Sequence, residues 1–106
     1  MSKPWPPPPD IESIQELVRA ADPEGHLAEG APPDEYEPEE ELLFAALAPL
    51  PMQQLVVMNV LPVIEKIWRF SFALDDESLD QRRPALMALA LQIERFFGPG
   101  ATPQVR

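Results

Sequence analysis

The chain lacks cysteine and contains one histidine, one tyrosine and four glycines among its 106 residues. The absence of cysteine excludes disulfides, thiolate metal sites and cysteine nucleophiles. No serine lies in a nucleophile motif that His26 could serve, and the few glycines form no phosphate-binding loop. The sequence therefore predicts no catalytic residues and no cofactor, and we expect a protein that is not an enzyme.

Long hydrophobic runs are also missing. The longest apolar stretches, 55–64 and 85–91, are too short to span a bilayer, and residues 1–9 contain no apolar core of a signal peptide. Hydrophobic residues make up 45% and charged residues 25% of the chain, which is typical of a globular domain. We expect one cytoplasmic domain that does not associate with membranes.

Basic residues are scarce, and the charge is unevenly distributed. Eight Lys and Arg stand against 18 Asp and Glu, which gives a net charge of −10. Residues 1–51 contain twelve acids against Lys3 and Arg19, whereas 52–106 contain six of each sign. Such a field repels nucleic acid and speeds encounter with positively charged proteins. The predicted partner is a basic protein; the alternative is that the charge serves only solubility, since net charge alone does not fix a function.

Fifteen prolines divide the chain into segments. Residues 1–9 form a proline-rich tail, which either is a ligand for another protein or packs on the domain through Trp5. Asp10 is a predicted N-cap for a helix over 11–21, and Asp22-Pro23 ends that helix. Residues 22–37 then form a long loop, which we expect to be ordered through Asp22 and Tyr36.

Three further helical segments follow the loop, and no strand pattern is present. They are 38–48, then 52–74 with a kink or a division at Pro62, and finally 84–97, with Ser78 and Gln81 at capping-box spacing before it. The predicted fold is therefore an all-α bundle of about four helices over 10–98, with a flexible 99–106. The predicted core consists of Leu17, Leu43, Ile64, Ile67, Phe72, Leu89 and Ile93.

The acidic segment 34–41 precedes the apolar run 42–47. Acidic residues favour a helix N-terminus, and they also concentrate negative charge on a surface. For Tyr36 we favour an anchor that packs on the first or last helix with its hydroxyl in water; the alternative is an exposed recognition residue. The residues predicted to bind protein are Asp34, Glu35, Tyr36, Glu37 and Glu40.

A metal site is the alternative use of this loop. His26 could be joined by four acids of the same loop, since oxygen-rich clusters bind calcium, magnesium or manganese. The four acids are Glu29, Asp34, Glu35 and Glu37. Their spacing matches no EF-hand loop, and runs of acids are usually solvated faces. Metal binding is therefore the weaker hypothesis.

The order of short motifs resembles a known family. Asp22-Pro23-x-Gly25 is followed by Tyr36-x-x-Glu39 and then by Ile64-x-x-Ile67-Trp68-x-x-Ser71-Phe72. Over about 11–97 this order is similar to the YugE-like family of small bacterial helical proteins of unknown function. Here Ala21 replaces an aromatic residue before Asp-Pro, and the loop after Gly25 is longer. The resemblance implies a compact helical fold and no established activity.

Three hypotheses of function follow. The first is a non-enzymatic protein-binding module, in a specific form an immunity-type or regulatory protein that covers a basic partner such as a nuclease toxin. The second is a metal-dependent enzyme that uses His26 and the acidic loop. The third is a structural homodimer formed through the apolar last helix, so the chain is expected to be a monomer or a homodimer.

Overall fold

The computed structural model describes residues 8–101, and these fold into four α-helices and one short 3₁₀ helix. The helices are α1 (Ile11–Ala21), α2 (Glu37–Leu47), α3 (Val57–Phe72) and α4 (Asp76–Phe97), with η1 (Met52–Gln54) between α2 and α3. The described part of the chain contains no strand. The predicted all-α fold is confirmed.

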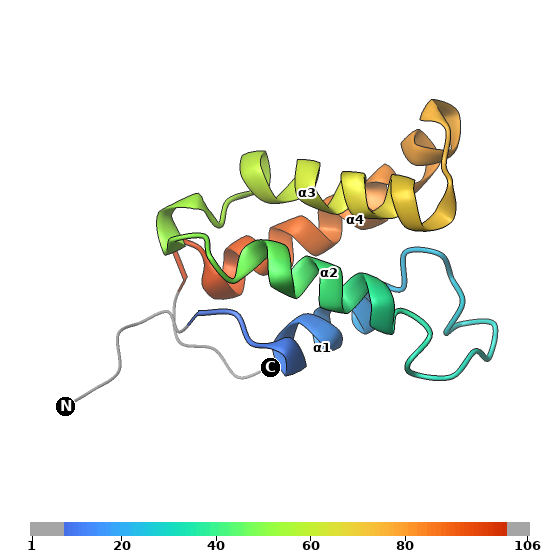
Figure 1. The fold of residues 1–106 in the computed structure, drawn as a ribbon, viewed down its shortest axis with the longest axis horizontal. Coiled ribbons are helices and arrows are strands. Elements are labelled where there is room, and N and C mark those ends of the chain that lie inside the picture. Colours follow the sequence, from blue (N-terminus) through green and yellow to red (C-terminus); the bar gives the residue numbers. More distant parts are fainter. Residues whose placement is uncertain (1–7, 102–106) are drawn as a thin grey trace.

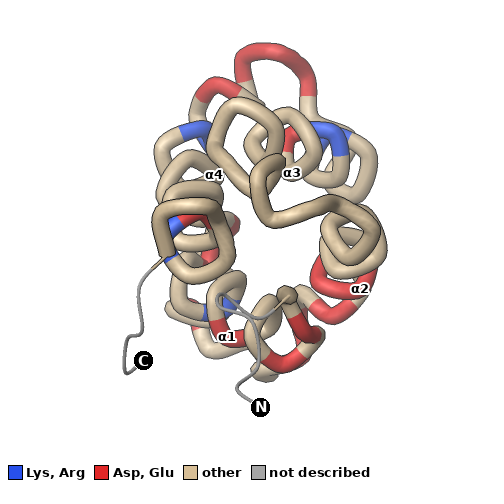
Figure 2. Tube along the Cα trace, turned by 90° about the vertical axis from the view of Figure 1, so that its left-hand side faces the viewer, with Lys and Arg blue, Asp and Glu red and all other residues tan. Residues whose placement is uncertain are grey.

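The four helices pack as an up-and-down bundle, in which each helix runs opposite to the previous one (Figure 1). Each helix contacts two neighbours, because α1 packs on α2 and α4, and α3 packs on α2 and α4. Seen along the long axis, the helices surround one apolar interior (Figure 2). Consecutive helices are therefore neighbours throughout.

The beginning of α1 and the end of α2 follow the local signals in the sequence. The carboxylate of Asp10 accepts a hydrogen bond from the backbone N–H of Ser13 at 3.2 Å, as expected of an N-cap. Pro38 lies in the first turn of α2, where its missing N–H leaves no hydrogen bond unmade. The chain leaves α2 at Ala48, directly before Pro49.

Two predicted helix limits were wrong. The third segment was expected to begin near 52, whereas α3 starts at Val57. It continues through the exposed Pro62 in its second turn, which agrees with the alternative of one helix and excludes a division there. The last helix begins at Asp76 rather than at 84, with Pro84 inside it. Asp75 is the N-cap and accepts from the Ser78 N–H at 2.8 Å, so Ser78 lies inside the helix and is not the cap.

The core is continuous along the bundle, with Trp68 at 0% exposure as its largest side chain. It contains five of the seven predicted residues, namely Leu17, Leu43, Ile64, Leu89 and Ile93. Ile67 and Phe72 are only partly buried, because they lie beside the strip of α3 that carries Val60, Ile64 and Trp68. The predicted core face of α3 was therefore rotated slightly from the observed one.

The apolar residues of α4 serve this core. Leu86, Leu89, Ala90 and Ile93 are buried between α4 and its neighbours, and Leu91 is half exposed. Most of the large apolar side chains of α4 are thus turned into the core, and a homodimer through this helix stays a prediction. No helix within residues 8–101 is long and apolar enough to cross a membrane.

The ends of the domain meet near the C-terminus of α4. Pro9 is buried, and Pro8 and Pro9 line a small hollow with Leu50, Leu55 and Phe97 among its other walls. This end of the proline-rich tail thus packs on the domain, while Trp5 and the rest of 1–7 lie outside the described residues, as do 102–106 of the expected flexible C-terminus. At Gly98 a Cβ would come within 2.6 Å of two carbonyl oxygens, so close approach requires the glycine.

Candidate functional site

The loop between α1 and α2 is organised by the carboxylate of Asp22. This residue ends α1 in the left-handed region, at φ 43°, and its side chain accepts from the backbone N–H groups of Leu27 at 3.1 Å and Ala28 at 2.9 Å. It also accepts from the hydroxyl of Tyr36 at 2.6 Å. Asp22 therefore holds both ends of the loop together, as expected from the sequence.

Tyr36 is fully buried at 0% exposure. Its ring stacks on His26 with centroids 5.6 Å apart and lies 6.1 Å from the ring of Trp68 on α3. The hydroxyl donates to Asp22 and accepts from the Glu24 N–H at 2.9 Å. Burial and the hydrogen bond to Asp22 both raise the pKa of Tyr36 well above its usual range.

This placement corrects two expectations about Tyr36. The hydroxyl is not in water, and the ring packs against α3 rather than against the first or last helix. Because no part of the side chain reaches solvent, Tyr36 is unavailable as an exposed recognition residue. Tyr36 therefore closes the loop over the core. It contacts Asp22 and Trp68, so the three motifs that carry the family resemblance meet at this residue.

Glu40 is also removed from the predicted binding surface. It is fully buried at 0% exposure, and its two oxygens accept from Nε and Nη2 of Arg19 on α1, both at 3.2 Å. Burial raises the pKa of Glu40, while the hydrogen bonds and charge of Arg19 oppose that rise. The prediction that Glu40 contacts a partner was wrong, because α1 covers its side of α2.

Three of the five predicted protein-binding residues remain on the surface. Asp34, Glu35 and Glu37 are all exposed at the end of the loop and the start of α2; we call these three residues the acidic edge. No Lys or Arg in residues 8–101 forms an ion pair with any of them. Figure 2 shows acidic positions along α1 and α2, with most basic positions on α3 and α4.

The residues of the metal hypothesis do not come together. Nδ1 of His26 lies 3.7 Å from Oε1 of Glu35, too far for a hydrogen bond. Glu29, Asp34 and Glu37 are exposed. Within the described residues, no group of three or more His, Cys, Asp or Glu side chains could hold a metal ion. The five residues of the metal hypothesis therefore do not converge on one point.

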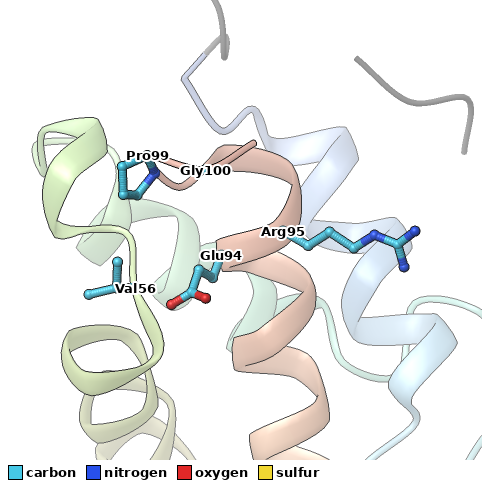
Figure 3. Close-up of a pocket in the computed structure, with 5 residues that line it drawn as sticks. All are labelled: Val56, Glu94, Arg95, Pro99 and Gly100. Carbon is cyan, nitrogen blue, oxygen red and sulfur yellow. The ribbon is translucent and has the colours of Figure 1, made fainter. Parts of the chain in front are cut away.

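A hollow of about 260 Å³ lies between the start of α3 and the end of α4 (Figure 3). In Figure 3 the carboxylate of Glu94 points toward Val56, while Arg95 points away from the hollow. Oε1 of Glu94 accepts from the backbone N–H of Val57 at 2.9 Å and caps the start of α3, whose own N-cap residue makes no side-chain bond. The carboxylate of Glu94 in this hollow therefore has a structural role.

A larger groove of about 360 Å³ separates α2 from α3 and is lined mostly by apolar side chains. Its walls are formed by Leu42, Ala46, Val63, Lys66, Ile67 and Phe70. Leu42 is 46% exposed and Phe70 is 82% exposed, although both are large apolar residues. Sequence reasoning missed this surface, and the signal that could have found it is the spacing of Val63, Ile67 and Phe70 on one side of α3.

Glu39 provides a pH-dependent element beside this groove. Its side chain is almost fully buried, and burial together with the nearby carboxylates of Glu40 and Glu35 raises its pKa, against the effect of the Ser71 hydroxyl. A carboxyl whose pKa is higher in the folded state binds its proton more tightly when folded. Its ionisation therefore destabilises the fold as pH rises.

We expect the thermal midpoint to rise as pH falls from about 7 toward about 4.3, the ordinary pKa of glutamate. Glu39→Gln should raise the midpoint at neutral pH and flatten this dependence. Glu41→Gln is the matched control, since it removes the same charge from an exposed neighbour. Equal slopes for the two variants in calorimetric scans would show that general charge repulsion, rather than Glu39, causes the pH dependence.

No family model, curated protein or solved structure matches this chain. The resemblance to the YugE-like family therefore stays a prediction. The two surface features that bear on function are the acidic edge and the groove between α2 and α3.

Proposed function

We propose that this protein is a non-enzymatic binding module that recognises a basic protein through its acidic edge. The observation that carries the proposal is the exposure of Asp34, Glu35 and Glu37 within four consecutive positions, without a Lys or Arg partner within residues 8–101. No Lys or Arg of the described residues neutralises this charge, although His26 lies 3.7 Å from Glu35. Such a surface attracts basic partners and repels acidic ones.

The loop is also held in a form suited to recognition. Asp22 fixes the two ends of the loop by hydrogen bonds. Tyr36, which lies between Glu35 and Glu37 of the acidic edge, is buried in the core and holds that segment in place. A surface that is already ordered loses little conformational entropy when it binds. This supports a preformed contact surface, and a specific form of the proposal is an immunity-type or regulatory protein that covers a basic nuclease.

The test uses a partner captured from the source cells and then purified. The Asp34→Lys/Glu37→Lys variant should slow association by about tenfold at low salt, because charge mainly affects the association rate. The effect should shrink as salt rises, since a Debye length of about 8 Å at physiological ionic strength screens exposed charges. Surface plasmon resonance across a salt series measures both quantities.

Glu12→Lys/Glu77→Lys is the matched control. It makes the same change in net charge with two acids that are also exposed, and Glu77 lies in the first turn of α4 as Glu37 does in α2. If both variants slow association equally, net charge rather than the acidic edge guides the encounter. If neither slows it, the partner binds elsewhere and the proposal fails.

A further inference from the structure

The groove between α2 and α3 is an uncovered apolar face on an otherwise charged molecule. Large exposed apolar residues in residues 8–101 are few, namely Leu42, Met58, Phe70 and Leu91, and two of them line this groove. Lys66 is its only charged wall. A face with an apolar centre and few charges is typical of the core of a protein–protein interface.

The charge at this face argues that the groove is not the surface that binds the basic partner proposed for the acidic edge. Lys66 would repel a basic protein inserted into the groove, whereas the outer side of α2 offers the exposed carboxylate of Glu41 next to Leu42. On this face α3 thus contributes a positive charge in the groove wall, and α2 an exposed negative charge one residue before Leu42. A surface of this kind complements itself when a two-fold axis exchanges its edges.

The arrangement of α2 and α3 is compatible with such a two-fold axis. α2 and α3 lie side by side and run in opposite directions (Figure 1), and Leu42 and Lys66 line the same groove. A two-fold axis parallel to the helices places α3 of one copy over α2 of the other. Lys66 then meets the partner copy at the level of Leu42, where Glu41 is exposed.

We propose that a second copy of this chain covers the groove, so that two α2–α3 pairs form a four-helix interface with Phe70 and Leu42 at its centre and Lys66–Glu41 ion pairs at its edges. This surface differs from the last helix that the sequence suggested. It goes beyond the proposed function and lies apart from Asp34, Glu35 and Glu37. An experiment can therefore disprove self-association through the groove without disproving that the acidic edge binds a basic protein, and the reverse.

Sedimentation equilibrium of the full chain over a concentration series is the first measurement. Wild type should dimerise, and Phe70→Ser should raise the dissociation constant by about tenfold or more, as loss of a central aromatic anchor does. Met58→Ser is the matched control, because Met58 is 84% exposed on α3 but lies outside the groove. A wild-type chain that stays monomeric into the millimolar range overturns the proposal, as does an equal effect of both variants.

Charge exchange tests the orientation of the two copies. Lys66→Glu and Glu41→Lys should each weaken self-association, because each places like charges at both edges of the symmetric interface. A mixture of the two variants should form heterodimers, since the reversed side chain of one then faces the reversed side chain of the other. Dimers that ignore both substitutions, or a mixture that associates no better than either variant alone, would exclude this two-fold arrangement.

Discussion

Replacement of Arg19 by alanine is expected to lower the free energy of unfolding by about 3 kcal/mol. The guanidinium is the partner of Glu40, whose side chain is fully buried and accepts two hydrogen bonds from it. Without Arg19, the carboxylate must stay charged in an apolar setting or take up a proton. The expected loss lies at the low end for broken buried pairs because the Arg19 side chain is 32% exposed and water can partly replace it.

Urea denaturation of four chains tests this expectation: wild type, Arg19→Ala, Glu40→Gln and the double variant. Glu40→Gln in the Arg19→Ala background should recover much of the loss, because it removes the uncompensated charge. Arg83→Ala is the control; Arg83 pairs with Glu65 at 2.9 Å but is 45% exposed, so its loss should cost clearly less than that of Arg19. An Arg19→Ala loss as small as that of Arg83→Ala would contradict a buried ion pair.

The second large effect is expected at Asp22. Asp22→Ala removes an ionised acceptor of three hydrogen bonds and places alanine at a positive φ. Hydrogen bonds to charged groups each contribute about 1.5–3 kcal/mol and are not additive, and a non-glycine residue in the left-handed region costs about 1 kcal/mol. We expect a total loss of about 3–4 kcal/mol.

Asp22→Asn separates these contributions. Asparagine tolerates the left-handed region and keeps one oxygen acceptor, so this variant loses the charge and one acceptor oxygen without the cost of alanine at a positive φ. Tyr36→Phe removes only the hydroxyl and should cost about 1–2 kcal/mol. A double-mutant cycle between the two positions should show strong coupling; additive losses would mean that the hydrogen bond between Asp22 and Tyr36 contributes little.

The charge of Asp22 also predicts a pH dependence of the opposite sign to that of Glu39. Burial alone would raise the pKa of Asp22, but the hydrogen bonds from Tyr36, Ala28 and Leu27 outweigh it and lower the pKa. Its stabilisation is therefore present above about pH 3.9, the ordinary pKa of aspartate, and is lost as pH falls through the lower folded value. The difference between wild type and Asp22→Asn should shrink below about pH 4.

These variants also connect stability with the proposed binding. Asp22 and Tyr36 hold the segment that carries the acidic edge, and their loss should release this segment locally before the bundle unfolds. Hydrogen exchange of amides in the loop should then quicken in Asp22→Asn while the α3 and α4 amides stay protected. Ordinary protection of the loop in that variant would show that the network is not needed to position the acidic edge.

Local sequence signals predicted the helices where a single strong cap or stop was present. Asp10 and Asp22 limit α1 as expected, because side-chain oxygens and a proline act on their immediate neighbours. The start of α4 was missed because Asp75 and Ser78 both suit a cap, and only the folded chain shows which one accepts the hydrogen bond. At Pro62 the sequence left one helix and two helices as alternatives, and one helix forms because a proline early in an exposed part of a helix disrupts few hydrogen bonds.

The sequence by itself determined the fold class, the order of the helices, the concentration of acid before α2 and the absence of cysteine chemistry. These properties depend on composition and on the helical period, both of which are local. Only the tertiary structure decided which side of α2 each acid occupies: Glu39 and Glu40 are buried against α3 and α1, while Glu37 and Glu41 face solvent. The physical reason is that burial depends on the neighbouring helices, and four glutamates within five positions do not by themselves indicate where those helices pack.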